Sequence, residues 1–160
     1  MAEAKNRPEI EKLHGGILIP CNIHEVQRET EEGTSETVYR YEEIQLSQRN
    51  LPNNKRLRRA IANRLNQHLR EYLYSRYDQG TQSTIQGFAL KADRLGRSDI
   101  VDECEKILDW IAGVLDYYDT AKQSILSGSG DPQAVQWDFE ADVPPQNLRG
   151  WREIKAMFDS

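Results

Sequence analysis

The chain has 160 residues and a formal net charge of −5; 38% of its residues are hydrophobic and 29% are charged. This length suits one helical domain with a smaller appendage and excludes two large domains. The acidic net charge argues against a general nucleic-acid-binding protein. No apolar run is long enough to cross a bilayer, and the first residues lack a signal-peptide core. We therefore expect a soluble protein that is made and kept in the cytosol, or in a particle assembled there.

The N-terminal part of the sequence predicts a small antiparallel β unit. We expect residues 1–12 to form a flexible arm and residues 13–47 to form the β unit. Within it, GGILIP predicts a short strand that Pro20 ends, and ETVYRYEEIQLS has the alternating pattern of a second strand. The residues EEGTS predict a hairpin turn near Gly33. A three-stranded unit of this size is only marginally stable by itself, so we expect it to pack against the helices or against another chain.

Residues 53–126 predict three helices joined by short connections. The first helix begins after Leu-Pro, with Asn53 or Asn54 as its N-cap. The second lies in TQSTIQGFALKADRL and ends at Gly96. The third, residues 97–126, carries apolar residues at alternating spacings of three and four, which gives a wide apolar stripe. We expect the three helices to pack as an antiparallel bundle.

Residues 127–160 predict a linker and a C-terminal tail. SGSGDP indicates a flexible break, AVQWDFEADVPP indicates an extended segment, and NLRGWREIKAMF predicts a short amphipathic helix. The tail either folds back onto the bundle or anchors to a partner. The predicted fold class is therefore α+β and mainly α: a three-helix antiparallel bundle with a small N-terminal antiparallel β unit and an extended C-terminal tail.

The first predicted helix is strongly basic. Segment 53–77 contains seven Lys or Arg residues and one acidic residue, Glu71. Such a helix is either a nucleic-acid surface or a partner for neighbouring acidic side chains. We favour charge pairing because residues 97–126 hold seven acidic residues against three basic ones. An acidic chain would also repel phosphates over the rest of its surface.

The sequence contains no recognisable catalytic or metal-binding pattern. His14, His24 and His68 lie far apart, without the short spacing of ligand histidines on a helix, and we expect His68 to be a buried, hydrogen-bonded side chain. Cys21 and Cys104 are too few for a zinc site or a disulfide framework. No serine stands in a nucleophile-elbow pattern, and no glycine run fits a phosphate loop. We therefore expect no enzymatic activity, no metal and no cofactor.

Aromatic residues are denser than a bundle of this size requires. Aromatic rings with a polar tip favour half-buried seams and interfaces, while ordinary bundle core is the alternative. Trp110 and Tyr117 lie at the edge of the predicted stripe, where a partner would touch the helix. The predicted protein-interface candidates are Tyr39, Tyr41, Tyr77, Trp110, Tyr117, Trp137, Phe139, Trp151 and Phe158.

One pattern of residues extends over two runs of the sequence, RYDQGTQSTIQGFALKA and ILDWIAGVLDYYDTAKQSIL. An Arg-Tyr pair is followed by Gln-Ser, then by Trp-Ile, Val-Leu and Tyr-Tyr pairs and a Lys, and Trp-Asp-Phe comes later. This pattern, over roughly residues 70–140, resembles small proteins encoded among the tail genes of tailed bacteriophages. Its residues here are Arg76, Tyr77, Gln82, Ser83, Trp110, Ile111, Val114, Leu115, Tyr117, Tyr118, Lys122, Trp137, Asp138 and Phe139.

The resemblance implies a virion structural protein, made in the host cytoplasm, that acts as an adaptor or attachment component of the tail-fibre or baseplate region. Its expected partners are other tail proteins, with no membrane and no nucleic acid. Residues 14–46 would extend the sheet of a neighbouring protein, and residues 131–160 would strap across another subunit. Two alternatives stay open: a tail-fibre assembly chaperone absent from the mature particle, and a regulatory or nucleic-acid-binding protein that uses the basic helix. The apolar stripe also leaves a homo-oligomer open.

Overall fold

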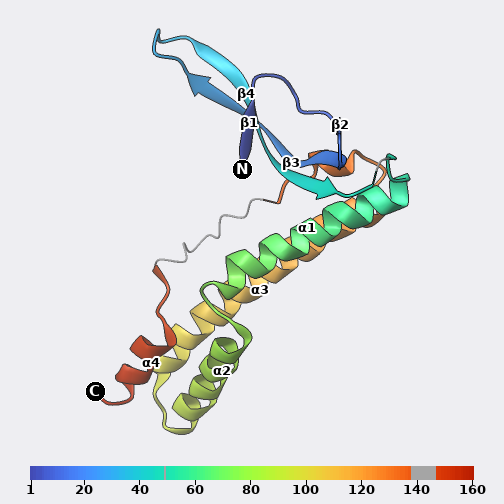
Figure 1. Cartoon of the computed structure of the whole chain (residues 1–160). Coiled ribbons are helices and arrows are strands. Elements are labelled where there is room, and N and C mark those ends of the chain that lie inside the picture. The colour runs from blue at the N-terminus through green and yellow to red at the C-terminus, as the bar shows by residue number, and fades with distance from the viewer. Residues whose placement is uncertain (49, 138–146) are drawn as a thin grey trace. The chain divides into compact units, whose positions relative to one another are not determined.

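The computed structural model describes residues 1–48, 50–137 and 147–160 and has an α+β fold (Figure 1). A group of strands comes first in the chain and a group of helices follows. In chain order the elements are β1 (Ala2–Ala4), β2 (Glu11–Leu13), β3 (Gly16–Glu29), β4 (Ser35–Leu46), α1 (Asn54–Tyr74), α2 (Gln79–Arg94), α3 (Ser98–Ser127), η1 (Pro132–Ala134) and α4 (Trp151–Met157).

The chain divides into two compact units. The sheet unit comprises residues 1–66 and 119–138, and the helical unit comprises residues 67–118 and 139–160. Helices α1 and α3 each contribute one part to the sheet unit and the other part to the helical unit.

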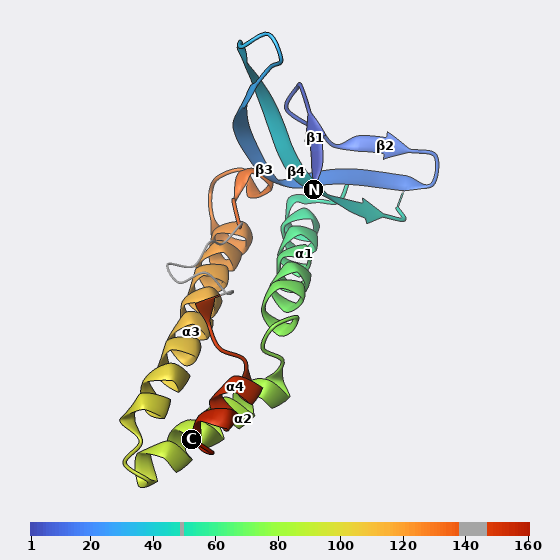
Figure 2. The ribbon, with the colours of Figure 1, turned by 90° about the vertical axis from the view of Figure 1, so that its left-hand side faces the viewer.

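The four strands form one antiparallel sheet in the order β1-β4-β3-β2, and the sheet curls (Figure 2). β3 and β4 are long because β-branched and aromatic residues recur on both sides of the turn that joins them. β1 and β2 are short: each pairs over three residues, with β4 and β3 respectively. Gly16 is required at the start of β3, since a Cβ there would overlap the carbonyl oxygen of Leu46. The buried apolar residues of the sheet are Ile17, Ile19, Cys21, Ile23 and Val38.

A tight turn joins β3 to β4. The amide of Thr30 donates to the carbonyl oxygen of Thr34 at 2.7 Å, and the amide of Gly33 donates to the carbonyl oxygen of Thr30 at 2.9 Å. Gly33 has φ +76°, a left-handed conformation that glycine adopts without a Cβ penalty. The hairpin predicted near Gly33 is confirmed.

Strand β3 runs through Pro20, so the prediction that Pro20 ends a short strand is wrong. Pro20 lies opposite Glu43 of β4, and its carbonyl oxygen accepts a hydrogen bond from Nε2 of Gln133 at 2.8 Å. The amide and carbonyl positions of a strand residue point to the same side. The missing N–H of Pro20 therefore faces away from β4 and removes no hydrogen bond of the β3–β4 ladder, which is where a sheet tolerates proline.

Strand β3 also contains a β-bulge. Cys21 lies opposite Glu42 and His24 lies opposite Arg40, so that two residues of β3 share the place of one residue of β4. Asn22, the first bulged residue, has φ +52°, and asparagine enters this left-handed region more easily than most residues do. The bulge turns the backbone so that a polar side chain enters the interior of the sheet unit: Asn22 is 0% exposed.

The first part of α1 and the end of α3 complete the sheet unit. The N-cap of α1 is Asn53, whose Oδ1 accepts a hydrogen bond from the amide of Arg56 at 2.9 Å, so one of the two predicted caps is confirmed. Arg58 joins the two helices, because its guanidinium donates to the carbonyl oxygens of Ile125 at 2.7 Å and Gly130 at 2.8 Å. These bonds satisfy carbonyls at the end of α3 and beyond it.

In the helical unit, both ends of α2 are set by the local sequence. Asp78 caps its start by accepting a hydrogen bond from the amide of Thr81 at 2.7 Å. At the other end Gly96 has φ +67°, and the amide of Arg97 donates to the carbonyl oxygen of Ala92 at 2.9 Å. This is a Schellman arrangement, and the predicted stop at Gly96 is confirmed.

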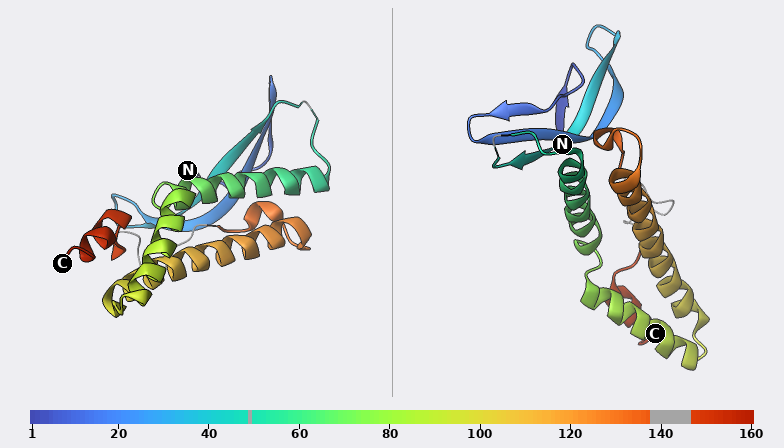
Figure 3. Two further views of the ribbon diagram at one scale, coloured as in Figure 1. Left: turned by 90° about the horizontal axis from the view of Figure 1, so that it is seen from below. Right: turned by 90° about the vertical axis from the view of Figure 1, so that its right-hand side faces the viewer.

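The C-terminal helix α4 packs against α2 within the helical unit (Figure 3). The ring of Phe158, just after α4, lies 5.5 Å from the ring of Phe88, and Nζ of Lys91 lies 4.5 Å from the centre of the Phe158 ring. The guanidinium of Arg97 donates to the carbonyl oxygen of Met157 at 3.0 Å. The C-terminal end of α4 is therefore held by side chains of the same unit.

The predicted three-helix bundle with a small β unit and an extended tail is wrong. The described residues form four α-helices and a curled four-stranded sheet, whose strands β1 and β2 include residues expected in a flexible arm. The 30 residues of α3 measure about 45 Å and the 16 residues of α2 about 24 Å, so α2 cannot cover the stripe of α3 along its length. The apolar stripe of α3 is shared by both units. The short helix predicted within NLRGWREIKAMF is confirmed as α4, and of the two alternatives for the tail, this helix folds back onto α2.

Candidate protein-interaction surfaces

A row of rings forms the interior of the helical unit. The hydroxyl of Tyr118 and Nδ1 of His68 lie 2.6 Å apart, and the His68 ring stacks with the ring of Tyr72. Trp110 lies between two tyrosines, with its ring 6.0 Å from Tyr72 and 5.8 Å from Tyr77. The expected hydrogen bond of His68 is confirmed, although the side chain is only half-buried. These offset and tilted contacts are the geometry in which aromatic rings attract one another.

Two of the predicted interface residues, Tyr77 and Trp110, lie inside this row, with exposures of 1% and 6%. The hydroxyl of Tyr77 donates to the carbonyl oxygen of Arg149 at 2.9 Å, and Arg76 donates to the carbonyl oxygen of Leu148 at 2.8 Å. Burial raises the pKa of Tyr77, against an opposing effect of the Arg76 guanidinium. The neutral hydroxyl therefore holds the segment before α4, and these rings serve the unit's own packing.

Trp137 is the central buried side chain of the sheet unit. It is 0% exposed, and its backbone amide donates to Oδ1 of Asn22 at 3.0 Å. The same oxygen lies 2.8 Å from Nε2 of His24, and Gln133 binds the carbonyl of Pro20 one turn earlier. The residues after α3 thus attach to the bulge of β3. Sequence reasoning missed this contact; Asn22, a turn-forming residue inside an apolar strand, was the available signal.

Four other predicted interface residues lie partly exposed on the surface. Tyr39 and Tyr41 of β4 are half-buried in the sheet unit. In the helical unit, Tyr117 meets Tyr118 edge-on with ring centres 5.7 Å apart, and the guanidinium of Arg152 lies 5.2 Å from the ring of Trp151. These four residues are thus divided between the two units. Phe158 contacts Phe88 as described, and Phe139 lies outside the described residues.

The outer part of the β3–β4 hairpin extends beyond its neighbouring strands (Figure 1). Its four residue pairs run from Val26 opposite Val38 to Glu29 opposite Ser35. β2 pairs with β3 only at residues 16–18 of β3, and β1 pairs with β4 only at residues 39–41. Both edges of the outer hairpin are therefore without a strand neighbour in the part of the chain that the structure describes.

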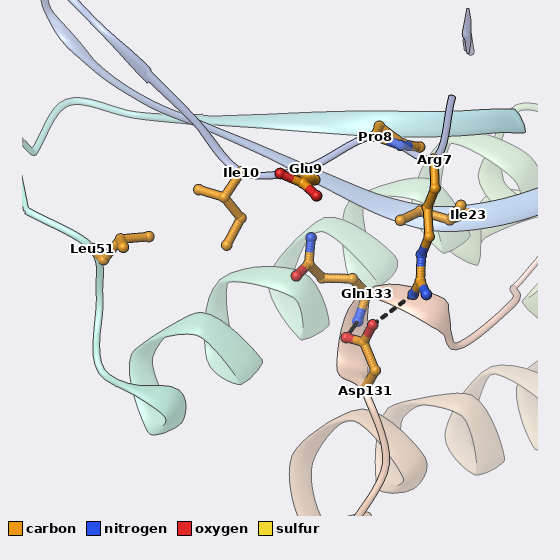
Figure 4. A pocket seen from close by; sticks show the side chains of 8 residues that line it. All are labelled: Arg7, Pro8, Glu9, Ile10, Ile23, Leu51, Asp131 and Gln133. Carbon is orange, nitrogen blue, oxygen red and sulfur yellow. Dashed lines mark hydrogen bonds and ion pairs between the residues drawn. The ribbon is translucent and has the colours of Figure 1, made fainter. Parts of the chain in front are cut away.

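A surface depression of about 470 Å³ lies in the sheet unit, between the N-terminal loop, the bulge and η1 (Figure 4). An ion pair between Arg7 and Asp131, 2.8 Å apart, crosses one side of it, while Ile10 and Leu51 supply apolar surface. Leu51 is 54% exposed. An exposed ion pair beside apolar side chains is more typical of a shallow protein-contact surface than of an enclosed ligand site.

The start of α1 presents a basic face in the sheet unit. Lys55, Arg56 and Arg59 are exposed, and none of them forms an ion pair with another described residue. Arg64 binds Glu42 of β4 at 3.0 Å, so the expected pairing of the basic helix with acidic residues of segment 97–126 is not what the described ion pairs show. A second depression, of about 460 Å³, lies along this face and is lined by Asn54, Lys55, Arg58, Arg59 and Leu126.

Both cysteines are buried and free. Burial, with a smaller effect of Glu42, raises the pKa of Cys21 to about 12, and burial raises the pKa of Cys104. The reactive thiolate is therefore suppressed at both positions while the chain is folded. Because Cys21 lies in the sheet unit and Cys104 in the helical unit, the two thiols report separately on the two units.

Comparison with protein-family models, with curated proteins and with solved structures finds no match to this chain. Among the described residues, no cluster of three or more His, Cys, Asp or Glu side chains is arranged to hold a metal ion. None of the described helices has the length and apolar character needed to span a membrane.

Proposed function

We propose that the chain is a structural adaptor of the bacteriophage tail, in the tail-fibre or baseplate region, and that it works by binding other virion proteins. The tail assignment rests on the sequence resemblance. The protein-binding role is supported above all by one observation, the outer β3–β4 hairpin with its two open edges.

An open edge offers hydrogen bonds that the chain itself does not use. Alternate residues of an antiparallel strand direct their amide and carbonyl groups away from the paired strand. Residues 25–29 of β3 and 35–38 of β4 therefore present backbone donors and acceptors along both edges. A strand of another protein can add to either edge, and side-chain contacts then select the partner.

The outer hairpin also lacks a core of its own. Val38 is buried and Val26 is half-buried, while most other side chains of the outer hairpin are exposed. Arg28 forms an ion pair with Glu3 of β1 at 2.9 Å, but an exposed pair of this kind contributes about 1 kcal/mol or less. Since a two-stranded hairpin is marginal in water, a partner strand would stabilise it considerably.

Site-specific photo-cross-linking tests this proposal. A photo-reactive amino acid replaces Gln27 on the outer hairpin in the phage genome that encodes the chain, and particles are purified, irradiated and analysed by mass spectrometry. The matched control carries the same amino acid at Gln123, an exposed position of α3 in the same unit. We expect the chain in the particles and a cross-link from position 27 to one tail protein, with none from position 123.

The other possible outcomes distinguish the alternative functions from the proposed one. A chain that cross-links to a fibre protein in the cell lysate but is absent from purified particles is an assembly chaperone. A chain present in particles without a cross-link from position 27 binds through another surface. The basic face of α1 is the one observation that favours nucleic-acid binding.

A further inference from the structure

The sheet unit carries two exposed surfaces of opposite charge. The acidic tip comprises Glu29, Glu31 and Glu32 around the hairpin turn, and the basic face comprises Lys55, Arg56 and Arg59. We propose that the acidic tip of one copy of the chain docks onto the basic face of a second copy. This inference concerns contacts between copies and does not require the tail function proposed above.

The acidic tip projects on a turn that is held by hydrogen bonds, and its carboxylates have no cationic partner among the described residues. Its carboxylates are exposed and form no ion pair with another described residue. The turn beneath them is held by hydrogen bonds between Thr30 and Thr34, including one between their hydroxyls at 2.7 Å. Three like charges held close together repel one another, so the isolated tip carries an electrostatic cost that a cationic partner relieves.

The basic face provides that partner surface, and it is concave. Lys55 and Arg59 are four residues apart and so lie on one side of α1. Leu126, which is 42% exposed, also lines the depression of about 460 Å³ beside them. The positive end of the α1 dipole adds to the attraction for carboxylates. A hairpin turn, which is narrow and convex, matches a hollow of this kind.

The tip and the basic face belong to the same unit but are not joined in one copy. Figure 1 shows the hairpin tip and the start of α1 at opposite ends of the sheet unit, and no described ion pair links them. The 12 residues of β4 alone span about 40 Å between these ends. The contact is therefore available only between copies, and because it joins two different surfaces it generates a ring or an open chain of copies.

A second copy fits the basic face better than nucleic acid does. The net charge of −5 repels a phosphate backbone and a second copy alike, so the choice between them depends on the shape and the local charge of the group that meets the face. The acidic tip of another copy brings equal and opposite charge on a small projection. Exposed ion pairs are individually weak and screened by salt, so the association should be strongest at low ionic strength.

Sedimentation velocity with charge-reversal variants tests the contact on the full chain. The tip variant is Glu31→Lys/Glu32→Lys, the face variant is Lys55→Glu/Arg59→Glu, and the control is Asp102→Lys/Glu105→Lys on an exposed part of α3. At an ionic strength of about 0.01 M, we expect the wild-type chain and the control to associate as concentration rises. The tip and face variants should each associate about tenfold more weakly. Circular dichroism checks that all variants keep the fold.

The decisive sample is the equimolar mixture of the tip and face variants, because the reversed tip of one then faces the reversed face of the other. We expect the mixture to recover association to within about threefold of the wild type, and high salt to abolish it. A wild type that stays monomeric overturns the proposal, as does a mixture that stays dissociated. Binding of a labelled DNA duplex that is lost in the face variant, without association between copies, would assign the basic face to nucleic acid instead.

Discussion

The sheet unit and the helical unit are stabilised in different ways. In the helical unit, helix ends are fixed by caps that lie within a few residues, and a row of rings from His68 to Tyr77 fills the interior. In the sheet unit the central contact joins Asn22 and Trp137, which are 115 residues apart in the chain. A helix end set by its own neighbours tolerates the loss of one distant contact. The sheet unit is held to the residues after α3 by several long-range contacts, among which the hydrogen bond between Asn22 and Trp137 is the buried one.

The largest expected effect is therefore the loss of this buried contact. Trp137→Ala deletes a side chain that is 0% exposed, and we expect the free energy of unfolding of the sheet unit to fall by about 3–5 kcal/mol. The measurement is urea-dependent alkylation of Cys21, with Cys104 as the internal reporter of the helical unit. Trp151→Ala is the matched control, because Trp151 is half-buried and should cost less. Equal shifts for Cys21 and Cys104 would contradict independent anchoring.

Replacing Asn22, the partner of Trp137, should have the next largest effect. Asn22→Ala leaves the buried amide of Trp137 without its acceptor and places alanine at φ +52°, so we expect a loss of about 3 kcal/mol. Asn22→Gly loses the same hydrogen bond but accepts the left-handed backbone, and should be about 1 kcal/mol more stable than Asn22→Ala. Chemical denaturation of both variants separates the contribution of the lost hydrogen bond from that of the left-handed backbone conformation. Identical losses would mean that the backbone of the bulge relaxes on substitution.

This contrast also explains what could be predicted from the sequence. The turn at Gly33, the N-cap Asn53 and the helix stop at Gly96 were predictable, because each is decided by a few neighbouring residues. The continuation of β3 through Pro20 was not predictable, since it depends on whether the missing N–H of Pro20 faces the paired strand or faces away from it. The apolar stripe of α3 was predictable from the spacing of its apolar residues, whereas its division between two units was not.

The candidate surfaces were predictable to a smaller extent. An abundance of aromatic residues predicts that rings gather, and Tyr72, Tyr77 and Trp110 do so. It does not separate core from interface, because both environments bury rings and satisfy polar tips. The edges of the hairpin are open because β1 and β2 each pair over only three residues. No periodicity in the sequence reveals how far these strands pair.

In the helical unit a single lost contact should cost less. Tyr77→Phe removes the hydroxyl that donates to the carbonyl oxygen of Arg149, and we expect a loss of about 1 kcal/mol. Tyr74→Phe is the control, because Tyr74 is 38% exposed, and it should leave stability nearly unchanged. Hydrogen exchange of α4 should also accelerate in the Tyr77 variant if this hydroxyl holds the segment before α4. Unchanged exchange in α4 would show that Arg76 and the packing on α2 suffice.

The smallest expected effect is a dependence on acidic pH. Hydrogen bonding from Lys106, and then Arg149, lowers the pKa of Glu103 below its ordinary value. A carboxylate with a lowered pKa in the folded state stabilises the fold above the ordinary pKa of 4.5, and this contribution is lost as the pH falls below it. We expect the wild type to lose a few tenths of a kcal/mol more than Glu103→Gln between about pH 5 and pH 3. Thermal unfolding at both values measures the difference, and parallel curves would contradict it.

The central claim is that the outer hairpin binds another protein through its edges, and hydrogen exchange of its amides tests this most directly. Mass spectrometry would follow residues 25–29 and 35–38 in the purified chain and in the assembled particle, with the turn of α3 around Gln123 as the reference. Outward-facing edge amides should exchange rapidly in the free chain and become protected in the particle, while the reference stays unchanged. Equal, rapid exchange of the edge amides in both samples would contradict the account.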